Sequence, residues 1–189
     1  MKFAAQECIK PASENGDEPT HDLWWKRAVR VTIRGPRYLS FIASDDYDCG
    51  GVHPANGTLT LTYDLSDGQA VNWGRVLPSG ARWIHTRDDG GMEVEVVHWP
   101  ALKSIMLRKA DANCRTVLQD YHLSFFLWLD GQTKQLMASA FGLPQVAIVC
   151  SGPFGLSIHE LRSLHVSPKL IDGLAAAPIG NERSATRVK

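Results

Sequence analysis

Residues 37–77 read RYLSFIASDDYDCGGVHPANGTLTLTYDLSDGQAVNWGRVL, and this stretch decides the fold of the chain. Between positions 58 and 65, Leu and Tyr side chains alternate with threonines and an aspartate. A period of two is typical of a β-strand with one buried and one solvent-exposed face. Ser66-Asp67-Gly68 follows directly, and Asp and Gly tolerate the positive φ that a hairpin turn requires. The stretch therefore predicts strand, glycine-broken loop, strand, tight turn and strand.

Further strands are expected on both sides of this stretch. Residues 29–33 alternate between apolar and polar before Gly35-Pro36, and residues 83–87 and 92–97 flank the hairpin signal Asp88-Asp89-Gly90-Gly91. Leu123–Leu129 and Val146–Cys150 are apolar on both alternating faces, a pattern typical of strands covered on each side. We expect these two runs at the centre of a sheet that also contains the strands of the first half.

Two helices have clear start signals. Pro100 begins a stretch in which Leu102, Ile105 and Met106 form one apolar stripe, and this helix is expected to run to about Asn113. Ser157-Ile158-His159-Glu160 fits the S-x-x-E capping box. The predicted fold class is α+β, a mainly antiparallel sheet with two or three helices packed on it.

The ends of the chain differ in composition from its middle. Residues 1–22 include a polar, proline-containing run without periodicity, which predicts a flexible leader, and residues 176–189 predict a flexible tail. At 189 residues, with 44% hydrophobic positions, the chain can form one sizeable core. We therefore expect a single α+β domain over residues 23–175.

Composition also bears on the partners of the chain. Twenty basic and twenty acidic side chains cancel, so no overall field attracts nucleic acid, and no nucleic-acid partner is predicted. The longest apolar runs fall far short of the roughly 20 residues of a membrane helix, so contact with a membrane would need a segment absent from this chain. No glycine-rich phosphate loop is present, and no cofactor is predicted.

Four cysteines bear on the cellular compartment. Cys8, Cys49, Cys114 and Cys150 show no C-x-x-C spacing, which argues against a zinc knuckle or a redox pair. An even number is compatible with two disulfides in an oxidising compartment, with three pairings open. For Cys150, inside an apolar run, a buried free thiol is an equal alternative.

Part of the chain resembles a known family. The residues that carry the likeness are Leu39-Ser40, Tyr47, Gly50-Gly51, His53-Pro54, Tyr63-Asp64-Leu65, Gly68 and Val76-Leu77, with a second, looser block over residues 125–164. In this order they resemble the extracytoplasmic domain shared by the lysozyme-binding anti-sigma-V factor and the non-catalytic part of a secreted peptidoglycan deacetylase.

The resemblance implies both a location and a role. Relatives work outside the cytoplasmic membrane, so we expect an extracytoplasmic domain, in the periplasm or at the cell surface, whose signal or anchor has been removed. Residues 1–9 by themselves lack a secretory signal and favour the cytoplasm, which is the alternative. The expected function is non-enzymatic recognition, as a sensor or binding domain of the cell envelope, of a protein such as lysozyme or of a peptidoglycan fragment.

The loop after residue 44 holds the densest cluster of reactive side chains. Asp45, Asp46, Asp48, Cys49 and His53 lie within nine positions. A hard ion prefers the carboxylates and zinc prefers sulfur and imidazole, so the mixture suits neither, and no metal site is predicted. The ordinary role of such a loop is local hydrogen bonding. The alternative function is a small cell-envelope hydrolase or metal-dependent enzyme that uses the segment from Asp45 to His53.

Aromatic residues complete the set of candidate binding residues. Core packing is expected for Trp83, Trp99 and Trp128, whereas Trp24-Trp25 and Trp73 lie nearer element ends. The partner-binding candidates are Tyr47, Asp48, His53 and Trp73. No catalytic residue is predicted, because no G-x-S-x-G or comparable nucleophile motif occurs.

Overall fold

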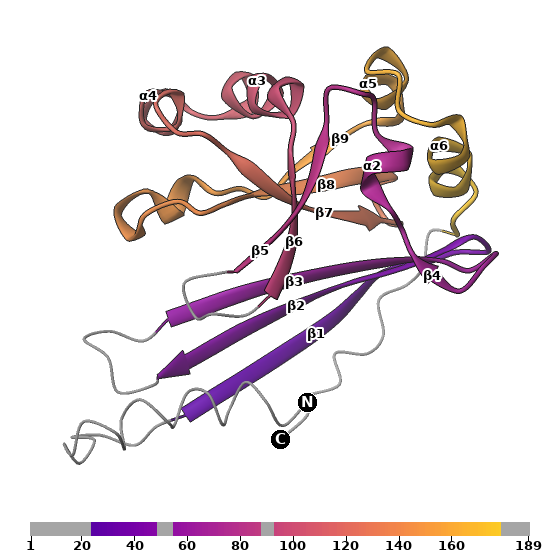
Figure 1. Cartoon of the computed structure of the whole chain (residues 1–189), viewed down its shortest axis with the longest axis horizontal. Coiled ribbons are helices and arrows are strands. Elements are labelled where there is room, and N and C mark those ends of the chain that lie inside the picture. The colour runs from indigo at the N-terminus through magenta and orange to yellow at the C-terminus, as the bar shows by residue number, and fades with distance from the viewer. Residues whose placement is uncertain (1–23, 49–54, 88–92, 179–189) are drawn as a thin grey trace.

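The computed structural model describes residues 24–48, 55–87 and 93–178. It confirms the predicted class, because two mainly antiparallel sheets are combined with α-helices (Figure 1). In spatial order, the first sheet contains β1 (Trp24–Arg34), β2 (Tyr38–Asp48), β3 (Ala55–Asp64) and β4 (Gln69–Ala70). The second contains β5 (Arg82–Arg87), β6 (Glu93–His98), β7 (Ser124–Asp130), β8 (Gln135–Phe141) and β9 (Phe154–Leu156).

The described residues form five α-helices, more than the two or three expected, and one 3-10 helix. They are α2 (Trp73–Val76), α3 (Pro100–Lys109), α4 (Ala112–Gln119), the 3-10 helix η1 (Gln145–Cys150), α5 (Ile158–Ser163) and α6 (Pro168–Ala175). Figure 1 shows α3, α4 and α5 on the side of the second sheet that faces away from β1, β2 and β3.

The first sheet follows the order predicted from residues 37–77. β2 pairs with β3 in an unbroken antiparallel register from Tyr38↔Asp64 to Tyr47↔Ala55. Gly68 has φ of 70°, so the Ser66-Asp67-Gly68 turn uses glycine at a left-handed position, as predicted. The Gly35 amide donates to the Tyr38 carbonyl at 2.9 Å and closes the turn between β1 and β2.

The buried face of β3 is not the face with the larger apolar side chains, which its alternating pattern predicts to be buried. Thr62 and Asp64 are buried, whereas Leu59 and Leu61 are half-buried and Leu65 is exposed. The face that carries Ser40 and Thr62 lies against β7, and one of its hydroxyls accepts a hydrogen bond from the second sheet. Oγ of Ser40 lies 2.7 Å from Oγ1 of Thr62 and accepts from the amide of Leu129 at 3.2 Å.

The expectation of one continuous sheet is wrong, because the two halves form separate sheets. β6 and β7 share one paired position, Val97↔Phe125, after which β7 diverges and runs over the first sheet. There the amide of Gly131 donates to the carbonyl of Thr32 at 2.8 Å. The largest hydrophobic cluster nevertheless includes Ile33 and Tyr38 of the first sheet together with β7, β8 and the helices. The halves therefore share one main core.

The helix predicted from Pro100 ends earlier than expected. α3 stops at Lys109, and Asp111 begins a second helix by accepting from the amide of Cys114 at 2.9 Å. An N-cap aspartate sets a new helix start in this way. The capping box at Ser157 and Glu160 is confirmed, and both of its hydrogen bonds are present.

The run Val146–Cys150 is not a central strand, and this prediction is wrong. It forms η1, in which Ala147 and Cys150 are buried while Val146 and Val149 are exposed. Three residues per turn place every third side chain on one side, so an apolar run need not be buried on both faces. The place beside β7 is taken by β8 instead.

A disulfide joins Cys114 of α4 to Cys150 of η1, across 36 positions of sequence. The expectation of a disulfide is confirmed for this pair, and the free-thiol alternative for Cys150 is wrong. Cys8 and Cys49 lie outside the described residues. Within the described part of the chain, no helix is long and apolar enough to cross a membrane.

Candidate functional site

The carboxylates of the predicted acidic loop do not converge. Successive side chains of β2 point to opposite faces, so Asp45 lies on one face and Asp46 and Asp48 lie on the other. Asp45 is fully buried and accepts two hydrogen bonds of 2.6 Å from the guanidinium of Arg27 on β1. These hydrogen bonds are the main reason that the pKa of Arg27 is raised, against the opposing effect of burial. Asp45 therefore serves as the partner of Arg27.

The other candidates from that region are only partly placed. Tyr47 is half-buried beside Trp25 of β1, and Asp48 is buried at the end of β2. Cys49, Gly50, Gly51, His53 and Pro54 lie outside the described residues. In the described ranges, no group of three His, Cys, Asp or Glu side chains is arranged to hold a metal ion.

The expectation that Trp73 lies near the surface is wrong. Trp73 is 7% exposed at the start of α2 and belongs to the main core. The turn after β4 brings α2 back against the second sheet, so a tryptophan near an element end becomes buried. Trp99 and Trp128 are buried as predicted, and Trp83 packs against the core while partly exposed.

Tyr63 and Asp64 end β3 and Gly68 lies in the turn after it, and of these family-motif residues Asp64 forms a structural junction. The carboxylate of Asp64 accepts from the amide and the hydroxyl of Ser66 at 3.0 and 2.7 Å, and from Arg37 at 2.8 Å. Nζ of Lys169 on α6 lies 3.6 Å away. Burial favours the neutral acid, but the hydrogen bonds from Ser66 and Arg37 outweigh it and lower the pKa of Asp64 to about 2.

Because of this junction, we expect the stability of the fold to depend on pH in the acid range. Because the folded pKa of Asp64 is about 2 and the reference value is 3.8, ionised Asp64 stabilises the fold fully above pH 4. That contribution, about 2 kcal/mol, is lost as the pH falls through 2.

We expect Asp64→Asn to be less stable than the wild type by this amount at pH 6, with the difference vanishing near pH 2. Urea unfolding at several pH values measures it, with Asp67→Asn as the control. A pH-independent difference would contradict the assignment.

A groove lies elsewhere, between the first sheet and the β5–β6 hairpin. It has a volume of about 420 Å³. Its lining comes from three strands: Leu59, Thr60 and Leu61 of β3, His85, Thr86 and Arg87 of β5, and Glu93, Val94 and Glu95 of β6. The two half-buried leucines supply the apolar part, and the hairpin supplies the charges.

One wall of this groove is a sheet edge whose backbone lacks a strand partner in the described residues. β4 pairs with β3 only at Tyr63 and Asp64. The carbonyl of Thr62 points to that outer side, because it accepts from the amide of Val71 at 2.7 Å. Since the backbone groups of alternate residues share a side and the β2–β3 register has no bulge, Thr58 and Thr60 present their N–H and C=O groups outward.

The opposite wall carries the positive charge of Arg87 and the negative charges of Glu93 and Glu95, beside the imidazole of His85. His85 and Glu95 face each other across β5 and β6 with 3.5 Å between Nδ1 and Oε1, and Arg87 and Glu93 are 3.6 Å apart. Both pairs are exposed to solvent and therefore contribute little to stability. These four residues were not among the binding candidates expected from the sequence. The signal was available in the hairpin motif Asp88-Asp89-Gly90-Gly91, because a hairpin there brings residues 85–87 close to residues 93–95 on adjacent strands.

Comparison with models of protein families finds no match to this sequence, and comparison with curated proteins finds none either. The likeness to the anti-sigma-V and deacetylase domain therefore stays a prediction that depends on the quoted motif residues.

Proposed function

We propose that this chain is a non-enzymatic, extracytoplasmic recognition domain, a sensor-type module of the cell envelope, and that it binds a protein by adding an extended segment of that partner to β3. The observation that carries the proposal is the outward-facing backbone of Thr58 and Thr60 beside the groove. An unpaired edge of this kind pairs readily with another extended chain.

The groove chemistry supports a polypeptide occupant. In a bound extended segment, backbone groups would pair with Thr58 and Thr60, while alternate side chains would contact Leu59 and Leu61 on one side and the charged hairpin on the other. Backbone pairing supplies affinity, and the walls supply selectivity. The charges of Arg87, Glu93 and Glu95 suit a segment that carries both signs.

Two further considerations support the proposed location and role. The Cys114–Cys150 disulfide suits an oxidising compartment, such as the periplasm or the cell surface. Asp45, on which the alternative hydrolase depends, is already engaged by Arg27. The family resemblance implies lysozyme as the specific partner, and we use lysozyme as the probe.

Thr60→Pro tests the binding mode. Its amide points away from β2, so proline removes an outward donor without breaking the β2–β3 ladder, as proline does on edge strands. We expect at least roughly tenfold weaker binding to lysozyme by calorimetry. Thr60→Val keeps the amide and is the matched control, expected to stay within roughly threefold of the wild type.

Two results would count against this proposal. Equal binding by the proline and valine variants would exclude strand addition at β3. Absence of wild-type binding to lysozyme and to peptidoglycan fragments at high micromolar concentration would remove both ligands that the resemblance implies.

A further inference from the structure

One face of the β5–β6 hairpin carries the ionisable side chains of the groove. In the ladder between the two strands, His85 lies opposite Glu95, and Arg87 lies opposite Glu93. Alternate residues of a strand share a face, so these four side chains lie on the same face of the hairpin, and all four line the groove. β3 contributes two leucines and a threonine to the lining, and therefore no charge.

The charges on this face do not cancel while the imidazole is neutral. Arg87 and Glu93 lie 3.6 Å apart and offset each other. Glu95 lies 3.5 Å from Nδ1 of His85, which is charged only when it is protonated. The face therefore carries one net negative charge with a neutral imidazole and none with a protonated imidazole. Because the side chain of Glu95 is 37% exposed and that of Glu93 is 86% exposed, solvent screens a cation less beside Glu95.

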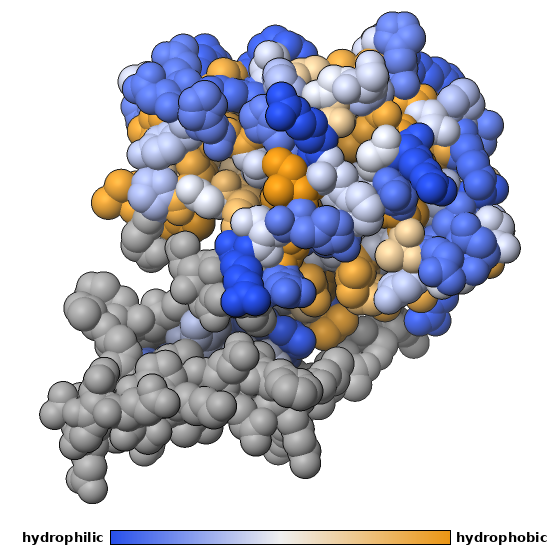
Figure 2. Space-filling model, viewed as in Figure 1, coloured by the Kyte–Doolittle hydropathy of each residue, from blue (hydrophilic) through white to orange (hydrophobic). Residues whose placement is uncertain are grey.

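The other neighbours of His85 in the described residues leave Glu95 as its main electrostatic partner. The ring of His85 contacts that of Trp83, with 4.7 Å between the centroids. α2, which packs beside β5, has one charged residue, the exposed Arg75. Asp88 and Asp89 lie outside the described residues. Figure 2 shows hydrophilic and hydrophobic residues side by side in the middle of the visible face, where Figure 1 draws β5 and β6.

We propose that the segment bound along β3 carries a lysine or arginine that pairs with Glu95, and that protonation of His85 weakens this pair. This inference rests on the proposed function, in which the groove holds an extended polypeptide. Complementary charges across an interface supply selectivity, and histidine changes its charge between about pH 5 and 8. The groove therefore holds a basic partner near neutral pH and releases it in mildly acidic surroundings.

Two heptapeptides with blocked ends test the preference for a basic residue. Each alternates valine and threonine, which favours an extended chain, and the central residue is lysine in one and glutamate in the other. In calorimetry of the full chain at pH 8, we expect a dissociation constant on the order of 100 µM for the lysine peptide and at least roughly tenfold weaker binding of the glutamate peptide. Glu95→Gln is expected to lose this preference, and Glu95→Lys to reverse it.

The role of His85 is tested by the pH dependence of the same measurement. Wild-type affinity for the lysine peptide is expected to fall at least roughly fivefold from pH 8 to pH 5.5, because protonated His85 neutralises Glu95. The lysine peptide has no group that titrates in this range, so the change arises in the chain. His85→Gln is expected to remove most of the difference between the two pH values.

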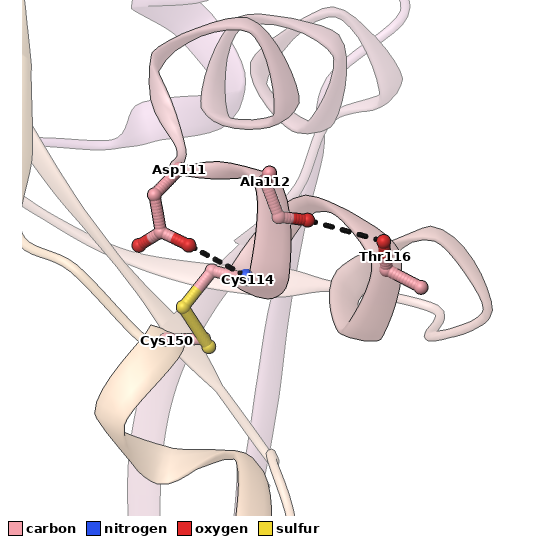
Figure 3. The surroundings of a disulfide bond; sticks show 5 residues. All are labelled: Asp111, Ala112, Cys114, Thr116 and Cys150. Carbon is pink, nitrogen blue, oxygen red and sulfur yellow. Dashed lines mark hydrogen bonds between the residues drawn. A yellow bond between two sulfur atoms is a disulfide. The ribbon is translucent and has the colours of Figure 1, made fainter.

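Asp120→Asn is the control for the loss of one carboxylate. Asp120 is exposed at the end of α4, on the side of the second sheet that faces away from β3. The disulfide between Cys114 and Cys150 and the cap formed by Asp111 hold this helix in place (Figure 3). This variant is expected to bind each peptide within roughly threefold of the wild type. Circular dichroism verifies that every variant is folded.

The possible outcomes separate this inference from the proposed function. If Thr60→Pro binds the lysine peptide more weakly than Thr60→Val does, but the wild type binds both peptides equally, strand addition stands and the role of Glu95 is wrong. A pH dependence that His85→Gln leaves unchanged would contradict the role of His85. If neither peptide binds at 1 mM, roughly tenfold above the expected dissociation constant, this inference is wrong, and the Thr60 variants with lysozyme still decide the proposed function.

Discussion

Replacing Cys114 and Cys150 together by alanine is expected to lower the free energy of unfolding by about 3 to 4 kcal/mol. The disulfide closes a loop of 36 residues that contains β7 and β8, so its loss frees a large part of the unfolded chain. It also releases η1 from α4, the helix against which η1 mainly packs. Denaturant unfolding of the double variant and the wild type measures the difference.

The wild type without reductant is the reference, and the double variant should keep the secondary structure content of the wild type by circular dichroism. A loss below about 1 kcal/mol would mean that η1 packs equally well without the bond, and would contradict the role assigned to it.

Gly173→Val is expected to destabilise the chain by about 3 kcal/mol. Gly173 lies in α6, where any β-carbon would overlap the ring of Tyr38 and approach Cδ of Arg37 at 2.8 Å. Tyr38 is 1% exposed, and its hydroxyl donates to the carbonyl of Lys169, so the ring has no room to move. Overpacking costs about 1 to 3 kcal/mol and occasionally more, which exceeds the roughly half kcal/mol gained in helix propensity.

Thermal or urea unfolding checks this result, and Gly80→Val is the control because a β-carbon at Gly80 would have no atom within 4 Å. The control should change stability by no more than about 0.5 kcal/mol. Equal effects at the two glycines would show that backbone freedom, and not the close approach of α6 to β2, determines the cost at Gly173.

Much of the fold could be predicted from local signals in the sequence. The turn at Gly68, the capping box at Ser157 and the buried strand over residues 124–130 each depend on interactions between neighbouring residues. The end of α3 was also locally encoded, since Asp111 is the N-cap of α4, although one helix was expected to run to about Asn113.

Other features depend on contacts between distant residues and could not be predicted in this way. The buried face of β3 is the one with Thr62, because Ser40 and the amide of Leu129 supply its polar surroundings. The exposure of Val146 follows from the 3-10 geometry of η1, in which Ala147 and Cys150 take the buried side. The burial of Trp73 follows from the return of the chain after β4.

In the candidate site too, some residues could be found from local sequence signals, whereas their partners come from distant parts of the chain. The sequence drew attention to the acidic loop, yet the partner of Asp45 is Arg27, which lies 18 positions away on another strand. The groove combines β3 with β5 and β6, and its defining property is an edge that, among residues 24–48, 55–87 and 93–178, β4 is too short to pair fully. An unpaired edge is a property of the assembled sheet and has no motif of its own.

Amide hydrogen exchange followed by NMR, with and without saturating lysozyme, tests strand addition most directly. In the free chain, the outward amides of Thr58 and Thr60 should exchange quickly, whereas those of Leu59 and Leu61 are protected by β2. Binding should slow exchange at Thr58 and Thr60 and leave Leu59 and Leu61 unchanged. New protection without this alternation, or none along β3, would contradict the account.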